Sequence, residues 1–203
     1  MIINPERIRL QLSHSKANNL RTCPPLPDIQ IRQTLPAAVL IPLILDGENW
    51  KVLFIKRTQK IHDRHSGQIA FPGGRADPND PTLEATALRE AQEEIGVNPA
   101  DVKILGQSCS ITTVTDYEVY PYAGILAWPY ELTLSTEEVE KTILIPVDWL
   151  ADPNNHQTRT WESPFGPGTE LPVIFFNEYE GEILWGVTAQ IVMDFLDLIQ
   201  NTP

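Results

Sequence analysis

The chain has 203 residues, 42% of them hydrophobic, and a formal net charge of −12. This length and apolar content suit one globular domain with a sizeable core. The acidic balance argues against nucleic acid or an anionic membrane surface as a partner. Cys23 and Cys109 are isolated, which indicates neither a disulfide framework nor a zinc site. Residues 1–7 contain no apolar signal core and no run approaches transmembrane length, so we expect a cytoplasmic protein.

The chain is expected to begin with an arm over residues 1–33, which is helical over 5–12 and then rich in proline. A nearly continuous apolar run over 37–45 predicts a buried strand, and residues 51–57 predict its hairpin partner. Further strands are expected over residues 102–105, 118–128, 143–147, 171–176 and 182–185.

The last predicted element is a helix that Thr188 caps. Its apolar face consists of Ile191, Val192, Phe195, Leu196 and Ile199. Strands that are interrupted and followed by helices predict an α/β (α+β) fold, in which a mixed sheet lies between helices. We expect a single domain over residues 34–203 after the arm.

A helix before Gly96 is predicted to carry three acids on one face. Glu90, Glu93 and Glu94 stand at i, i+3 and i+4, so their side chains project together. Like charges at this spacing repel, and a bound divalent cation explains the cluster better than helix stability does. Ligands that are all oxygen suit Mg²⁺ or Mn²⁺. The alternative is a solvated acidic helix face, which is what most charge runs are.

The ends of this helix also carry signals. Asp80 is predicted as the N-cap and Pro81 as the first helical residue. Gly96 is placed to close the helix in the left-handed conformation. Before the helix, residues 71–74 read Phe-Pro-Gly-Gly, a tight loop whose backbone can approach a metal or a phosphate closely.

Residues 73–97 resemble the signature of the Nudix hydrolases, which is a glycine, a glutamate further on, and then Arg-Glu-apolar-x-Glu-Glu-x-Gly-apolar. The second half matches completely over residues 89–97. In the first half one residue is inserted. The slot for the outer acid falls on Asp80 when counted from Gly74, and on Pro81 when counted from Arg89. The outer glutamate is therefore replaced by Asp80 or absent. The resemblance implies an α/β/α sandwich with a mixed β-sheet and metal-dependent hydrolysis of a pyrophosphate.

The resemblance also implies roles for residues of the signature. Glu90, Glu93 and Glu94 would bind the metal, with the backbone carbonyl of Gly73 as a further ligand. Arg89 would orient Glu93, which lies four residues on. The general base would be either Glu90 or an acid outside the signature. The first candidate outside it is Glu138, with Glu137 and Glu140 as substitutes; the alternative for this stretch is an acidic solvent loop.

A narrower resemblance, to the coenzyme A pyrophosphatases, lies just upstream, over residues 53–58 and 64–74. Residues 115–124 and 185–189 also look similar to that subfamily, although Asp116 replaces an expected glycine. Lys56, Arg57 and Arg64 belong to the basic stretch of this segment, and guanidinium groups pair well with phosphates. The resemblance implies that they bind the substrate and that its 3′-phosphate is the target. The alternative is a solvated basic strand end.

Together these features predict a metal-dependent hydrolase of coenzyme A or acyl-CoA. The expected products are 3′,5′-ADP and 4′-phosphopantetheine or its acylated form. One alternative is a Nudix hydrolase of another nucleoside diphosphate, such as ADP-ribose or a dinucleotide. Another is a Nudix module that binds a nucleotide without cleaving it, against which the intact acid triplet speaks. A homodimer that uses the N-terminal arm is compatible with the sequence.

Overall fold

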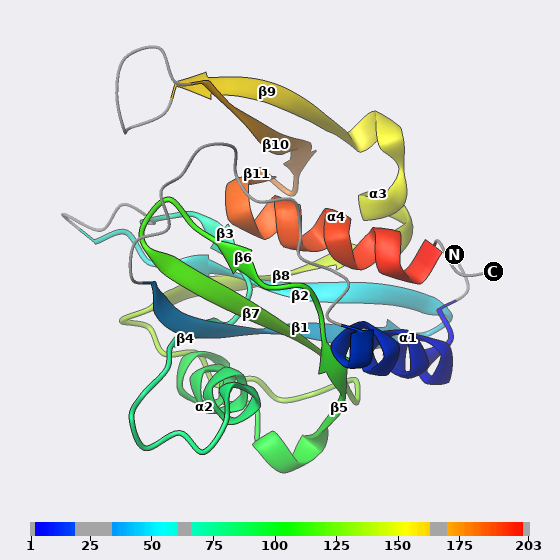
Figure 1. Cartoon of the computed structure of the whole chain (residues 1–203), viewed down its shortest axis with the longest axis vertical. Helices are drawn as coiled ribbons and strands as arrows, with labels where there is room; N and C mark the ends of the chain where they lie inside the picture. Colours follow the sequence, from blue (N-terminus) through cyan, green and yellow to red (C-terminus); the bar gives the residue numbers. More distant parts are fainter. Residues whose placement is uncertain (1–2, 19–33, 61–65, 163–169, 201–203) are drawn as a thin grey trace.

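The computed structural model describes residues 3–18, 34–60, 66–162 and 170–200 (Figure 1). The proline-rich part of the predicted arm and the predicted substrate residue Arg64 lie outside these ranges. Over the ranges that the structure does describe, no helix is both long enough and apolar enough to cross a membrane.

A mixed sheet forms the centre of the molecule. Strand β1 runs parallel to β7 and antiparallel to β2 and β4, while β5 and β6 pair with β7, and β3 and β8 pair with β2. These strands are β1 (Leu35–Asp46), β2 (Asn49–Arg57), β3 (Ile69–Ala70), β4 (Gly73–Arg75), β5 (Val102–Gln107), β6 (Ile111–Thr112), β7 (Tyr117–Leu126) and β8 (Val139–Pro146).

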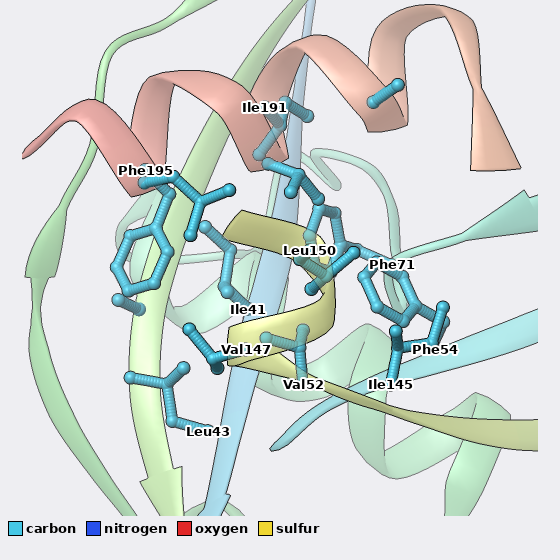
Figure 2. Packing of buried hydrophobic residues seen from close by; sticks show 14 of the residues in the cluster. Ile41, Leu43, Val52, Phe54, Phe71, Ile145, Val147, Leu150, Ile191 and Phe195 are labelled. Carbon is cyan, nitrogen blue, oxygen red and sulfur yellow. The ribbon is translucent and has the colours of Figure 1, made fainter. Parts of the chain in front are cut away.

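Helices cover both faces of this sheet, because its strands are apolar on both sides. In β1, Leu40 and Ile44 pack toward α2 (Leu83–Ile95), whereas Ile41 and Leu43 pack into the core on the other face. That second core also receives α1 (Pro5–Asn18), α3 (Val147–Ala151) and α4 (Gly186–Gln200). Figure 2 shows Ile191 and Phe195 of α4 above the sheet residues. The predicted α/β/α sandwich with a mixed sheet is confirmed.

A second, antiparallel sheet of three strands lies between α3 and α4 in the chain. It consists of β9 (His156–Glu162), β10 (Glu170–Tyr179) and β11 (Glu182–Trp185), in the order β11-β10-β9. In Figure 1 it lies on the α4 side of the main sheet, away from α2. Strands β10 and β11 were predicted, but β9 was missed. Its residues 156–160 are all polar, so no apolar alternation marks them as a strand.

Several predicted element ends are wrong by a few residues. The N-cap of α2 is Thr82, whose Oγ1 accepts a hydrogen bond from the Ala85 N–H at 3.1 Å, and not Asp80. Helix α4 begins at Gly186, so Thr188 lies inside it. The predicted closure of α2 by Gly96 is confirmed, with φ +72°. Two short 3₁₀ helices, η1 (Pro99–Asp101) and η2 (Pro153–Asn155), complete the fold.

Helix α1 extends to Asn18 and is part of the same core as the sheet. Ile8 and Leu12 are buried there, and Ile3, just before the helix, is buried with them. The helix begins after Asn4, whose side-chain oxygen accepts hydrogen bonds from the N–H groups of Glu6 and Arg7. The division into an arm over residues 1–33 and a domain over 34–203 stays a prediction.

Candidate active site

The three acids of α2 lie in different environments. The helix packs Ala87, Ala91 and Ile95 on the sheet, and its acids lie beside that packed stripe. Glu94 is 1% exposed, Glu90 is 16% exposed and Glu93 is 57% exposed. One helix face therefore carries a carboxylate in the interior, a second at its border and a third in solvent.

Glu94 is a buried carboxylate with two partners of positive character. Its Oε2 accepts a hydrogen bond from the N–H of Gly73 at 2.9 Å, and its Oε1 lies 3.8 Å from Nη1 of Arg57. Burial raises the pKa of Glu94 to about 7, although both partners act in the opposite direction. A buried ionised carboxylate is costly unless it is paired, so this site favours a cation next to Glu94.

The glycine loop before α2 is fixed at both ends. Phe71 is buried and its ring lies 4.8 Å from that of Phe54 in the core. Gly73 has φ +155°, and a Cβ there would clash with the carbonyl oxygen of Ala38. A Cβ on Gly74 would lie 2.6 Å from the carboxyl carbon of Glu90. The two glycines are therefore required so that the loop can lie against the acids.

Arg89 connects the acids of the signature to one another. Its Nη1 lies 2.9 Å from a carboxylate oxygen of Glu90 and 2.9 Å from one of Glu93. Its Nε and Nη2 donate to the two carboxylate oxygens of Asp80, each at 3.0 Å. Nη2 also donates to the carbonyl of Arg75 at 3.2 Å. The expected pairing of Arg89 with Glu93 is present, within a wider network.

The irregular half of the signature is resolved by Asp80. Besides Arg89, Asp80 accepts hydrogen bonds from the Thr86 hydroxyl at 2.9 Å and from the Asp77 N–H at 3.0 Å. Arg89, more than any other group, holds the pKa of Asp80 well below its usual range. A turn between Asp77 and Asp80 accommodates the extra residue, and the N–H of Asp80 donates to the Asp77 carbonyl at 2.9 Å. Of the two residues that the count along the sequence allowed in the slot of the outer acid, Asp80 and Pro81, the one that faces Arg89 is therefore Asp80.

Glu138 acts on the acids of α2 from outside the signature. Burial raises the pKa of Glu90 and is the largest influence on it; the nearby charges of Glu93 and Glu138 raise it further, while Arg89 opposes them. The charge of Glu138 also raises the pKa of Glu94. The charge of the predicted outside acid therefore makes ionisation of both carboxylates less favourable.

The predicted basic residues of β2 point in different directions. Arg57 lies on the α2 side of the sheet, with Nη1 near Glu94. Lys56 lies on the opposite side, where its Nζ is 2.9 Å from Glu182 and 3.1 Å from Glu140. Alternation along the strand explains this difference. The structure brings Arg57 to the acids and leaves Lys56 away from them.

The donors at this site suit a hard divalent cation in kind. The carboxylates of α2 and the backbone of Gly73 supply only oxygen, which is what Mg²⁺ and Mn²⁺ prefer. Across residues 3–18, 34–60, 66–162 and 170–200, however, no three acidic, histidine or cysteine side chains are gathered closely enough to hold an ion. Two of the three acids, Glu90 and Glu93, instead contact Nη1 of Arg89, each at 2.9 Å.

A hollow of about 600 Å³ opens beside Glu90 and Arg89. Its other lining residues are Pro36, Arg75, Ala76, Asp77 and Pro78. Arg75 was not singled out from the sequence, although its place directly after Gly73 and Gly74 was a usable signal. The carboxylate at the border of the core, that of Glu90, therefore lines an open hollow.

Comparisons with known proteins agree with this geometry. The family model described as the NUDIX domain matches residues 34–167. A protein of Photorhabdus laumondii named uncharacterized Nudix hydrolase NudL is 32% identical over 177 residues, which is 87% of this chain and 91% of that protein. A NudL of Pectobacterium atrosepticum is 30% identical over 173 residues, covering 85% of this chain and 87% of that one.

Among solved structures, a MutT/nudix family protein of Enterococcus faecalis matches with a TM-score of 0.53 and 17% identity. The match covers 96% of this chain and 73% of the other, and it shows the shared fold. Family members generally need divalent metal ions and act on small-molecule substrates. On the family match and the relatives together, the chain belongs to the Nudix family and is a pyrophosphohydrolase.

Proposed function

We propose that this enzyme hydrolyses the pyrophosphate bond of coenzyme A or acyl-CoA, with 3′,5′-ADP and 4′-phosphopantetheine or its acylated form as products. The observation that carries the proposal is the position of Arg57. This residue belongs to the segment that resembles the coenzyme A pyrophosphatases, and its guanidinium lies 3.8 Å from Glu94. The segment that resembles the coenzyme A pyrophosphatases therefore has one of its basic residues, Arg57, next to an acid of the Nudix signature, Glu94.

The chemistry follows from charge. A pyrophosphate repels an attacking water, and its leaving group gains negative charge during the reaction. A bound Mg²⁺ or Mn²⁺ would offset both and lower the pKa of a bound water. Glu90, Glu93, Glu94 and the carbonyl of Gly73 would hold the metal. Arg89 would position Glu90 and Glu93, which it contacts at 2.9 Å.

The general base in this proposal is Glu138. Two observations support this role: the N–H of Ser135, in the same segment, donates to the carbonyl of Glu94 at 2.9 Å, and the charge of Glu138 raises the pKa values of Glu90 and Glu94. A carboxylate there can take the proton of the attacking water. Glu90 is less suited, because Arg89 already occupies one of its oxygens at 2.9 Å.

Arg57 and Arg64 would bind the phosphates of the substrate, with the 3′-phosphate of coenzyme A as the feature that distinguishes it. A guanidinium can hold a phosphate through two parallel hydrogen bonds. Arg57 adds a second guanidinium, besides that of Arg89, to a site in which acids outnumber cations. The proposal includes cytoplasmic location, and a homodimer is its expected assembly.

A substrate panel tests this proposal. The protein would be incubated with Mg²⁺ or Mn²⁺ and coenzyme A, acetyl-CoA, dephospho-CoA, ADP-ribose, NADH or nucleoside triphosphates, and the products identified by mass. We expect coenzyme A to be cleaved with the highest kcat/KM, and dephospho-CoA, which lacks the 3′-phosphate, to be cleaved less efficiently. The Arg57→Gln variant should reduce the difference between these two substrates.

The same panel can refute the proposal. Turnover of ADP-ribose or NADH without turnover of coenzyme A would assign the enzyme to another nucleoside diphosphate. Binding without turnover of any substrate would indicate a module that binds nucleotides. Equal kcat/KM for coenzyme A and dephospho-CoA would remove the 3′-phosphate from the recognition scheme.

A further inference from the structure

The segment that carries Glu138 is held from two sides. At the α2 side, the N–H of Ser135 donates to the carbonyl of Glu94 at 2.9 Å. At the β2 side, the N–H of Thr58 donates to the carbonyl of Glu138 at 2.9 Å, and the Thr58 hydroxyl donates to the carbonyl of Thr136 at 3.3 Å. The backbone around Glu138 is therefore fixed between the end of α2 and the end of β2.

A β-bulge lies at the point where this segment enters the sheet. Lys56 pairs with Lys141, but the next residue, Arg57, pairs with Val139, so Glu140 is an extra residue in β8. The bulge reverses the alternation of the strand. Val139 is buried in the α2-side core and Leu144 packs against the same core, although the two are five positions apart and regular alternation would put them on opposite faces. Bulges of this kind redirect side chains next to active sites.

Lys56 holds the bulged residue. Its Nζ lies 3.1 Å from Glu140 and 2.9 Å from Glu182, and its side chain is 17% exposed. Contact with a substrate phosphate would require Lys56 to leave both carboxylates and to cross to the side of β2 where Arg57 lies. The Lys56 side chain is therefore held by its ion pairs with Glu140 of the bulge and with Glu182.

We propose that Lys56, through Glu140, is a positioning residue that keeps the bulge in place and thereby directs Glu138 toward Glu90 and Glu94. This inference rests on the proposed function, in which Glu138 is the general base. It replaces the prediction that Lys56 binds substrate. Thr58 supports the same segment through its backbone and its hydroxyl.

Steady-state kinetics with coenzyme A test this inference. Lys56→Met and Glu140→Gln should each lower kcat roughly 10- to 100-fold, the scale seen for groups that orient a ligand or a catalytic side chain. KM should stay within about twofold, because no substrate contact is lost. Lys141→Met is the matched control. It removes a 2.8 Å ion pair with the same Glu182 but leaves the pair between Lys56 and Glu140 intact, so kcat should be unchanged.

The Glu138→Gln background separates positioning from general stability. If Lys56 acts through Glu138, adding Lys56→Met to Glu138→Gln should lower kcat by no more than about twofold. Thermal unfolding of each variant checks that it is folded, and Glu140→Gln serves if Lys56→Met is not. A raised KM with unchanged kcat for Lys56→Met would overturn the inference in favour of a substrate contact. The inference would also be overturned if Lys56→Met lowered kcat equally in the wild-type and Glu138→Gln backgrounds. Wild-type activity of Glu138→Gln alone would overturn it as well.

The proposed function can fail separately. If the wild-type enzyme does not cleave coenzyme A but cleaves another member of the substrate panel, the substrate assignment is lost. The same set of variants, measured with the substrate that is cleaved, then still decides the role of Lys56.

Discussion

Two groups of charged side chains lie on opposite sides of β2, and they differ in how their charges balance. The acid cluster consists of Asp80, Glu90, Glu93, Glu94 and Glu138, and Arg57 and Arg89 are the cations found against it. The lysine cluster consists of Lys56, Lys141, Glu140 and Glu182.

The two clusters differ in whether their charges are balanced by partners within the protein. In the lysine cluster two ammonium groups face two carboxylates, so the charges cancel and the cluster joins β2 and β8 to β11. In the acid cluster a single guanidinium, that of Arg89, contacts three acids. Surplus negative charge at the border of the core is unfavourable in an empty protein and favourable for one that binds cations. An excess of charge of one sign thus distinguishes the chemical site from the structural one.

The largest effect is expected from Glu93→Gln. Glu93 is mostly exposed, so the variant should keep the wild-type melting temperature while kcat falls at least ~10²-fold, the scale for removing a principal charge-stabilising group. Glu84→Gln, an exposed acid in the first turn of the same helix, is the matched control. Near-normal activity of Glu93→Gln in steady-state assays would refute its assignment to the metal.

The next largest effect is expected from Gly74→Ala. The added Cβ would lie 2.6 Å from the carboxyl carbon of Glu90, so either the loop or the carboxylate must shift. Moving a catalytic group by about 1 Å can lower the rate about 10²-fold. Kinetics and thermal unfolding of the variant, measured together, separate the two effects. Full activity would show that Glu90 does not need its present position.

A smaller loss is expected from Asp80→Asn, which preserves shape but removes the charge that faces Arg89. Arg89 would then be balanced only by Glu90 and Glu93 and would hold them more tightly. We expect kcat to fall roughly 10-fold, with a higher concentration of Mg²⁺ needed for half-maximal activity. Asp152→Asn changes a similar turn far from the site and is the control. Unchanged metal dependence would mean that the outer acid is dispensable here.

The last prediction concerns stability in the absence of metal and no effect on rate. The pKa of Glu94 is raised from 4.5 to about 7 in the folded protein, so the folded state binds more protons than the unfolded state between these values. The contribution of Glu94 to stability is therefore present at low pH and is lost as the pH rises through 7, by about 3 kcal/mol at most. In EDTA, Glu94→Gln should lose this part of the pH dependence of the melting temperature. Identical profiles for the two proteins would contradict the raised pKa.

Local periodicity was sufficient to predict much of this molecule. The spacing of Glu90, Glu93 and Glu94 predicted one helix face, and the closure of the helix at Gly96 was correct. The apolar run that became β1 predicted a buried strand, and most of its residues are buried in the structure. These features could be predicted because helix and strand periods act over a few residues.

Features that depend on distant partners could not be predicted in this way. The choice between Asp80 and Pro81 was settled by Arg89, which reaches back over the turn to bind Asp80. The N-cap of α2 is Thr82 and not the predicted Asp80, because the Asp80 carboxylate is bonded to Arg89. Strand β9 lacks an apolar pattern and forms because β10 pairs with it.

The sequence by itself determined the acids, the glycine loop and the basic pair in β2, because these are fixed by residue type and spacing. Tertiary structure alone decided which partner each charge has. Lys56 and Arg57 are adjacent in the sequence, yet one contacts Glu140, 84 residues away, and the other contacts Glu94. Strand alternation sends neighbours to opposite faces, and only the packed fold shows which carboxylate lies on each face.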